Sequence, residues 1–322
     1  MVTTVGYCHR CDWNRTPEPR LCRSRRRISR RNSVALPVGA VRRGRLRPGD
    51  AVRQRLVPEA VRGRALGLYI GTYELGSGLS FVFATVAAEA VNWQLAIGVT
   101  SVGALFVAPM VLGLTRDNPE RTMSSATFDL SLFRNGEFLS AVSIYSWHNR
   151  ELFGVRNWLL AFLVATPAFA AVDSAVVPGL VVGAMVIMSG AGNTAGGWLS
   201  DRLGRPRTIA TGLGLSTLLS AMFGLLGGLP LVVLVVLVLV YGVVLALDSA
   251  PTSTLVTEVV PDGHVGTALS LQSLAGFSTT VVSPVVFGIA LDRSGYPIAF
   301  LTLAAGASLG LLSVGALTWV RQ

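Results

Sequence analysis

The feature that most constrains this chain is a series of eight apolar segments, each about long enough to cross a membrane as a helix. A helix needs roughly 20 mainly apolar residues to span about 30 Å of hydrocarbon. The segments run near 65–88, 93–114, 138–169, 176–198, 208–226, 229–247, 267–291 and 297–320. Strands are the competing interpretation, but the segments are too long and lack period-two alternation. We therefore expect an all-α integral membrane protein with about eight transmembrane helices.

Composition excludes the soluble classes. Of 322 residues, 51% are hydrophobic and only 14% are charged, whereas roughly a quarter of the residues in a soluble domain carry charge. The net charge of +10 belongs to one end: the first 55 residues hold 15 Arg and three acids, and the rest hold 12 Arg and 14 acids. This basic segment lacks regularly interleaved aromatic residues, so we expect a lipid bilayer rather than a nucleic acid as partner.

The arginines of the short loops predict an orientation. With eight spans, the segment before residue 65 and the C-terminus share a side. The arginines on that side are Arg62, Arg64, Arg116, Arg121, Arg134, Arg202, Arg205, Arg207 and Arg321, whereas the other side holds Arg293 alone. We therefore expect a multi-pass protein of the cell membrane with a cytoplasmic C-terminus.

The sequence repeats itself at an offset of 203 residues. Residues 57–59 (VPE) fall on 260–262 (VPD), and residues 63–68 (GRALGL) fall on 266–271 (GTALSL). The register continues without a gap into the next span. The first two spans thus copy the last two, as in transporters built from parallel repeats, although chance similarity of apolar helices is the competing explanation.

Residues 1–55 do not fit this repeat. The offset predicts two spans in residues 5–50, because residues 208–253 contain two, but the segment is rich in Arg. One hypothesis is translation from a wrong frame or wrong start. The other is a disordered basic arm that contacts anionic lipid. Cys8 and Cys11 have the spacing of half a zinc knuckle, but Cys22 is the only later cysteine, so we expect no metal site.

A loop motif, GWLSDRLGRPR, occupies residues 197–207 between the fourth and fifth segments. It resembles the cytoplasmic loop signature G-x-L-x-D-R-x-G-R-R of the major facilitator superfamily. The matching polar and glycine positions are Gly197, Asp201, Arg202, Gly204 and Arg205. Pro206 replaces the final basic residue, and Arg207 follows one position later.

The resemblance implies a partial transporter fold, equivalent to helices five to twelve of twelve. Residues 56–114 then form the last two helices of an incomplete first half, 115–136 a cytoplasmic central linker, and 137–322 a complete six-helix second half. The family implies that the loop motif latches the inner gate. The competing interpretation is that Arg202, Arg205 and Arg207 only set the orientation.

Ionisable residues inside spans are costly and are functional candidates. Glu74 lies mid-span on one face with Gly63, Gly67, Gly71 and Gly78. This face predicts a small-residue packing stripe that carries one carboxylate. Glu74 either pairs with a neighbouring helix or carries a proton or substrate.

The third segment carries polar residues all around its axis, among them His148, Arg150, Glu151 and Arg156. It either breaks near Gly154 or protrudes, with the polar ring in a water-filled cavity. His148 and Glu151 are three residues apart and can share a proton, and Arg156 can bind an anion.

Asp248 closes an apolar run before Pro251. It either lines the central cavity or marks the inner end of its helix.

These observations favour a secondary active transporter of a small solute that works by alternating access, with a proton as candidate coupling ion. The alternative is a truncated, non-transporting membrane protein. The body has no phosphate loop, nucleophile elbow or metal-ligand set, so we expect neither an enzyme nor a cofactor. The sequence does not identify the solute.

Overall fold

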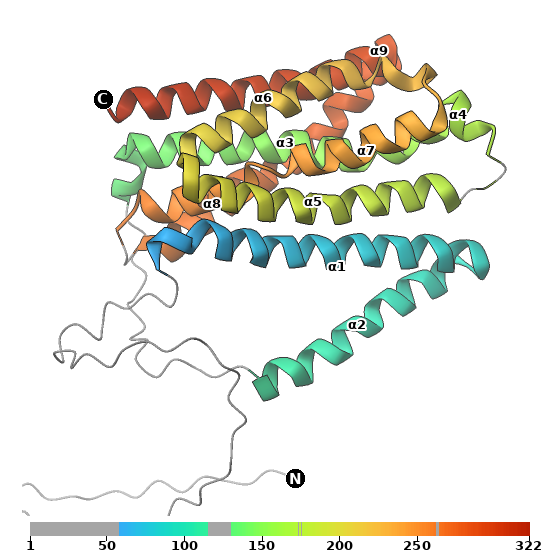
Figure 1. Ribbon diagram of the computed structural model, residues 1–322, viewed down its shortest axis with the longest axis horizontal. Coiled ribbons are helices and arrows are strands. Elements are labelled where there is room, and N and C mark those ends of the chain that lie inside the picture. Colours follow the sequence, from blue (N-terminus) through green and yellow to red (C-terminus); the bar gives the residue numbers. More distant parts are fainter. Residues whose placement is uncertain (1–57, 115–129, 173, 175, 262–263) are drawn as a thin grey trace, which may run out of the picture. The chain divides into compact units, whose positions relative to one another are not determined.

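The computed structural model describes residues 58–114, 130–172, 174, 176–261 and 264–322, and these form helices joined by turns, with no strand among them (Figure 1). The α-helices are α1 (Arg62–Ala90), α2 (Trp93–Leu114), α3 (Gly136–Val164), α4 (Pro167–Ala170), α5 (Val176–Leu203), α6 (Arg205–Phe223), α7 (Leu231–Leu245), α8 (Ser249–Glu258) and α9 (Val265–Val320). Short 3-10 helices are η2 (Glu59–Val61), η3 (Leu130–Arg134) and η4 (Leu226–Gly228). The basic segment 1–55, its cysteines and most of the expected linker lie outside the described residues.

Each apolar segment expected from the sequence is helical. The last two segments form the single long helix α9, which is interrupted at Gly295. There φ is +77°, a conformation that glycine adopts without a steric penalty, and Pro297 follows two residues later. At the 203-residue offset Gly295 falls on Asn92, where the chain turns from α1 into α2. This agreement is what the repeat predicts.

The third segment lacks the break that was one of its two expectations, and its helix ends earlier than expected. Helix α3 does not break near Gly154, and it ends at Val164 instead of Phe169. Its end precedes Pro167, which starts the separate short helix α4 and disfavours helical backbone at the residue before it. Gly154 lies inside the regular helix, where a methyl group would meet the Ser283 hydroxyl oxygen at 2.6 Å.

The sixth segment extends beyond its expected end near residue 247. Helix α7 ends at Leu245, and after a short turn α8 carries the chain to Glu258. Pro251, which has no backbone N–H to donate, explains why the helix is interrupted here. Asp248 thus lies in the turn between the end of α7 and the start of α8, and ten further helical residues follow it.

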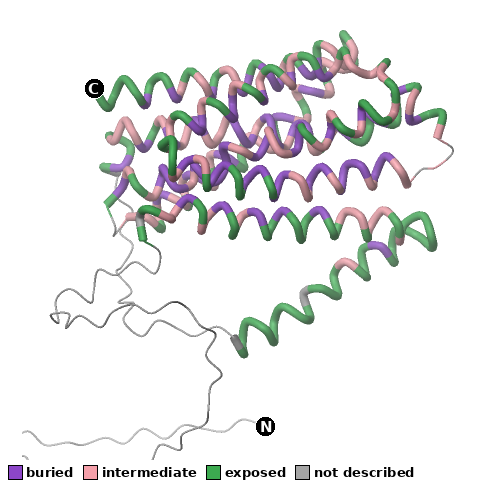
Figure 2. The backbone as a smooth tube through the Cα atoms, viewed as in Figure 1, coloured by how far each residue is buried: buried purple, intermediate pink, exposed green. Residues whose placement is uncertain are grey.

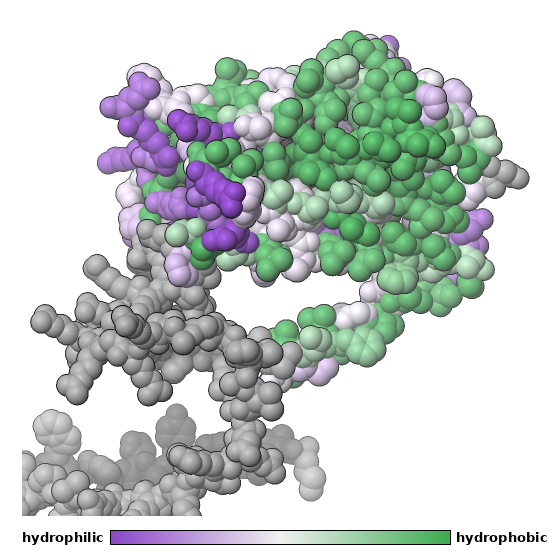
Figure 3. All heavy atoms as spheres, viewed as in Figure 1, coloured by the Kyte–Doolittle hydropathy of each residue, from purple (hydrophilic) through white to green (hydrophobic). Residues whose placement is uncertain are grey.

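Among the described residues, four helical segments are long and apolar enough to cross a membrane by length and composition. They are 93–113, 176–203, 231–258 and 265–320. Apolar side chains cover most of the bundle face shown in Figure 3. Helix α2 is exposed over almost its whole length (Figure 2). Such surfaces suit hydrocarbon better than water.

Two long helix pairs form the frame, since α1 packs along α5 and α3 packs along α9 (Figure 1). The buried residues of α1 are four glycines and one acid, namely Gly63, Gly67, Gly71, Glu74 and Gly78. A methyl group on Gly67 would lie 2.6 Å from the Asn193 carbonyl oxygen. The predicted small-residue stripe is confirmed, and it brings the two backbones into close contact.

Candidate functional site

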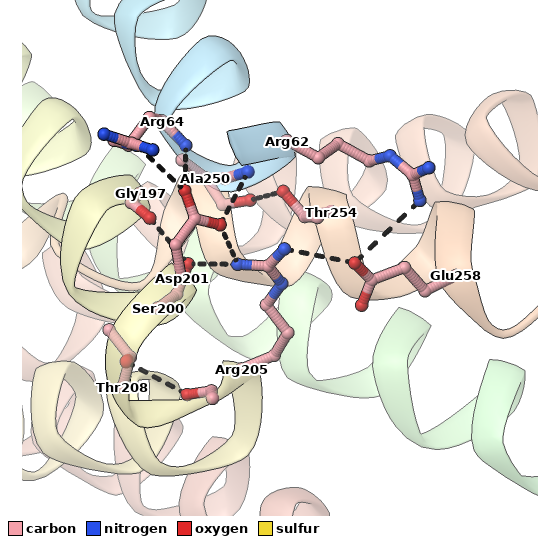
Figure 4. A network of polar contacts seen from close by, with 12 residues as sticks. Arg62, Arg64, Gly197, Ser200, Asp201, Arg205, Thr208, Ala250, Thr254 and Glu258 are labelled. Carbon is pink, nitrogen blue, oxygen red and sulfur yellow. Dashed lines mark hydrogen bonds and ion pairs between the residues drawn. The ribbon is translucent and has the colours of Figure 1, made fainter. Parts of the chain in front are cut away.

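The loop motif closes one end of the bundle, which we call the loop end. Asp201, in the last turn of α5, accepts hydrogen bonds from the backbone N–H groups of Gly63 (3.0 Å) and Arg64 (2.9 Å) (Figure 4). These groups belong to the first turn of α1, where the helix leaves N–H groups without helical partners and carries a partial positive charge. The Asp201 carboxylate therefore caps α1 from a helix more than 130 residues away in the sequence.

Arg205 extends this contact to α8. Its guanidinium Nη1 donates to Asp201 Oδ1 and Ser200 Oγ, both at 2.7 Å, and its Nη2 donates to Glu258 Oε1 at 3.1 Å. Burial is the largest influence on the pKa of Arg205 and lowers it, but the bonds to Asp201 and Glu258 together raise this pKa above its usual value. Arg62 also lies 4.0 Å from Glu258. These residues form one network that joins α1, α5, α6 and α8.

The local sequence explains the sharp turn. Gly204 has φ of +88° between α5 and α6, so a glycine is favoured there. Pro206, which departs from the family signature, lies in the first turn of α6, where its missing N–H would have no helical partner. Gly197 is also required, because a Cβ atom at this position would collide with the carbonyl oxygen of Gly63.

Two arginines of the loop motif lie outside this network. Arg202 stacks on the Trp198 ring, with its guanidinium carbon 3.8 Å from the ring centroid. Arg207 makes no ion pair within the part of the chain that the structure describes, and its carbonyl accepts a bond from Thr211. The structure thus separates Arg205, which bridges helices, from two arginines that do not.

Glu74 and Arg156 meet inside the bundle. Arg156 Nη2 of α3 lies 2.5 Å from Glu74 Oε2 of α1, and the Glu74 residue is only 5% exposed. The sequence placed Glu74 and Arg156 in separate roles, as a carboxylate candidate and an anion-binding candidate. Their pairing places opposite charges in contact and links α1 to α3.

Glu151 lies among hydroxyl groups. Its carboxylate is fully buried and accepts hydrogen bonds from Ser216 (2.9 Å) and Ser220 (2.5 Å) of α6. Ser220 also contacts the hydroxyl of Tyr241 on α7. We did not identify these partners from the sequence, although the spacing of Ser216 and Ser220 by four residues places both hydroxyls on one helical face.

His148 faces the break between α7 and α8. Its Nδ1 lies 3.0 Å from Asp248 Oδ1, and its Nε2 lies 2.7 Å from the Ser249 hydroxyl. His148 and Asp248 are 2% and 1% exposed. The other Asp248 oxygen, Oδ2, has no hydrogen-bond partner among the described residues. Asp248 and Ser249, at the turn into α8, are thus the polar neighbours of the His148 ring.

The polar side chains around the axis of α3 therefore contact different neighbouring helices. Glu74 of α1 meets Arg156, α6 meets Glu151, and the α7–α8 break meets His148. Arg150 donates to the carbonyl of Thr302 on α9 at 2.6 Å. Among the described residues, no group of three or more His, Cys, Asp or Glu side chains is arranged to hold a metal ion.

Comparison with known proteins identifies a family. The family model described as Major Facilitator Superfamily matches residues 152–322, slightly more than half of the chain. The matched region begins inside α3 and includes the whole loop motif. No curated protein matches the chain.

Proposed function

Because the chain belongs to the major facilitator superfamily, a family of membrane transporters, we propose that it is a secondary active transporter that moves a small solute across the cell membrane by alternating access. In this mechanism two groups of helices rock about a site near the midplane of the bilayer, so that the site opens to one side at a time. We propose no enzymatic reaction for the chain.

The observation that carries the proposal is the Asp201 contact with Gly63 and Arg64. It joins the last helices of the first repeat to the second repeat at one end of the bundle, and it uses charge-assisted bonds that can form in one state and break in another. Arg205 and Glu258 reinforce it from α6 and α8. In this proposal, the contacts of Asp201, Arg205 and Glu258 hold the loop end closed.

We orient the loop end toward the cytoplasm. Arg62, Arg64, Arg202, Arg205 and Arg207 gather at the same end of the bundle, and the positive-inside rule places such a cluster on the cytoplasmic side. The C-terminus reaches this end as well, because Arg321 pairs with Glu137 at the start of α3 at 2.8 Å. Opening of the loop end then releases solute to, or takes it from, the cytoplasm.

We assign the coupling proton to the cluster of Glu151, His148 and Asp248. Glu74 is a weaker candidate because Arg156 compensates its charge. Glu151 has only hydroxyl donors within bonding distance among the described residues, and a buried carboxylate without a cationic partner favours binding a proton. The charged and titratable groups around it are His148, Asp248, Tyr241 and the neighbouring Arg150.

The gate is tested by a reversible crosslink. Arg62→Cys and Glu258→Cys are combined in a chain whose Cys8, Cys11 and Cys22 are replaced by Ser, and the protein is reconstituted in liposomes. Uptake is screened with a panel of labelled sugars, amino acids, organic ions and drugs under an imposed proton gradient. We expect a bifunctional methanethiosulfonate crosslinker, which spans the gap left by the two shortened side chains, to stop uptake and reductant to restore it, since the crosslink holds the loop end closed.

Each single cysteine variant is the control for reaction with the crosslinker alone. Uptake that continues in the crosslinked protein would contradict the gate. The non-transporting alternative is supported if the unmodified, correctly inserted chain moves none of the panel in either direction.

A further inference from the structure

A groove on the outside of the α1–α5 pair is not used by the proposed transport mechanism. It encloses about 690 Å³ between the two helices near the loop end. Its lining includes Arg64, Leu68 and Leu75 of α1 and Gly190, Ala195 and Trp198 of α5. We propose that this groove binds an anionic phospholipid, with an acyl chain between α1 and α5 and the phosphate at Arg64 and Arg202.

The length and position of the groove fit one leaflet of a bilayer. It follows α1 from Arg64 to Leu75, which is roughly 16 Å at 1.5 Å per residue, about half of the 30 Å hydrocarbon thickness. Leu68 and Leu75 are 59% and 45% exposed, so this side of α1 faces outward. Glu74 and Arg156, which contact each other, do not line this groove.

The walls of the groove suit an acyl chain. Small residues of α5, among them Gly190 and Ala191, line it and leave room for a chain between the helices. The two threonine hydroxyls in the wall are already satisfied, because Thr72 donates to the Tyr69 carbonyl at 2.8 Å and Thr194 donates to the Gly190 carbonyl at 2.9 Å. The wall therefore offers hydrocarbon contact and requires no polar ligand.

The end of the groove is basic. Arg64 lines it with a side chain that is 53% exposed, and Trp198 beside it carries the stacked guanidinium of Arg202. Tryptophan and arginine commonly lie at the depth of lipid headgroups. The only acid in contact with these arginines among the described residues is Asp201, 3.5 Å from Arg64 Nε, and its oxygens already accept bonds from α1 and Arg205.

The apolar groove and the two arginines together determine which lipid binds. A guanidinium binds a phosphate oxygen pair with two parallel hydrogen bonds, and two guanidiniums beside one apolar channel complement a single anionic headgroup with its chains. A zwitterionic lipid of the same chain length has the same apolar contact but a neutral headgroup. We therefore expect selectivity for phosphatidylglycerol over phosphatidylcholine.

Native mass spectrometry of the detergent-purified full chain tests the site, with phosphatidylglycerol and phosphatidylcholine of matched acyl chains as probes. We expect a single phosphatidylglycerol adduct with at least tenfold higher occupancy than phosphatidylcholine. The double variant Arg64→Gln with Arg202→Gln should lose this preference, whereas Arg207→Gln, which removes a charge from the same loop away from the groove, should keep it.

A second variant tests the channel. Ala195→Phe fills the groove and should lower binding of both lipids, and Leu218→Phe on the exposed face of α6 should not. Gel filtration and thermal unfolding confirm that each variant is folded. Equal occupancy by the two lipids, an equal effect of Arg207→Gln, or displacement of the lipid by glycerol phosphate alone would each overturn the proposal.

Discussion

The carboxylate of Glu74 lies 2.5 Å from the guanidinium of Arg156, and this pair joins α1 to α3 inside the bundle. Glu74 is the only residue other than glycine that is buried on α1, so the carboxylate occupies a gap in a stripe otherwise made for close backbone contact. The two side chains come from opposite sides of the segment expected to link the two halves. The pair is therefore both a packing element and a charge bridge.

Removing one partner of this pair should be costly. Glu74→Gln leaves the Arg156 charge without its partner, and breaking a buried pair in this way costs about 3–5 kcal/mol. We expect a clear drop in thermal stability of the purified protein for Glu74→Gln. The double variant Glu74→Gln with Arg156→Gln should recover much of it, because no charge is then left unpaired. A double variant that loses the sum of the two single effects would contradict the pairing.

Two glycines of α1 make a matched comparison. A methyl group on Gly71 would lie 2.7 Å from Thr194 Oγ1 and 2.8 Å from the Gly190 carbonyl oxygen, whereas one on Gly76 would meet nothing within 4 Å. Alanine is favoured over glycine in a helix by about 1 kcal/mol. Gly76→Ala should therefore hold or raise the unfolding temperature, and Gly71→Ala should lower it. Equal effects would show that α1 and α5 do not pack closely.

Some of this fold follows directly from the sequence. The glycine and Glu74 face was predicted because residues at helical spacing share a side, and the eight apolar segments were predicted from length and composition. The sharp turn at Gly204 follows from the loop signature. These features depend on local sequence.

Other features depend on tertiary contacts that one sequence does not reveal. The partners of Glu151 and His148 lie on helices 65 and 101 residues away. The sixth span was predicted too short because the stretch after Asp248 is rich in Ser and Thr, which lowers its hydropathy. In the structure Thr254 bonds to the Ala250 carbonyl at 2.9 Å, so its hydroxyl is satisfied within α8.

The Asp201 network predicts that a substitution of Asp201 changes how often the loop end opens. Asp201→Asn weakens the cap on α1 and the ion pair with Arg205, so the loop end should open more often. Spin labels at Leu68→Cys and Leu203→Cys, both exposed positions, should report a larger share of long distances by pulsed electron resonance. Arg207→Gln is the matched control in the same loop. An unchanged distance distribution for Asp201→Asn would remove this carboxylate from gating.

Glu151 should control coupling. Glu151→Gln keeps the shape and the serine contacts but cannot take up a proton. We expect at least a tenfold loss of uptake driven by a pH gradient, whereas solute exchange without a gradient should remain. Glu137→Gln, which alters the exposed pair with Arg321, should leave both unchanged. Gradient-driven uptake by Glu151→Gln at the normal rate would exclude Glu151 as the proton site.

The proposed orientation predicts which residues face the outside of the cell. Ser294, beside the α9 break, and Gln322, at the C-terminus, are both exposed and lie at opposite ends of the second part of α9. With the three native cysteines replaced by Ser, a membrane-impermeant maleimide should label Ser294→Cys in intact cells. Gln322→Cys should react only after the membrane is permeabilised. The reverse pattern would place the loop end and its arginines outside the cell, against the positive-inside rule.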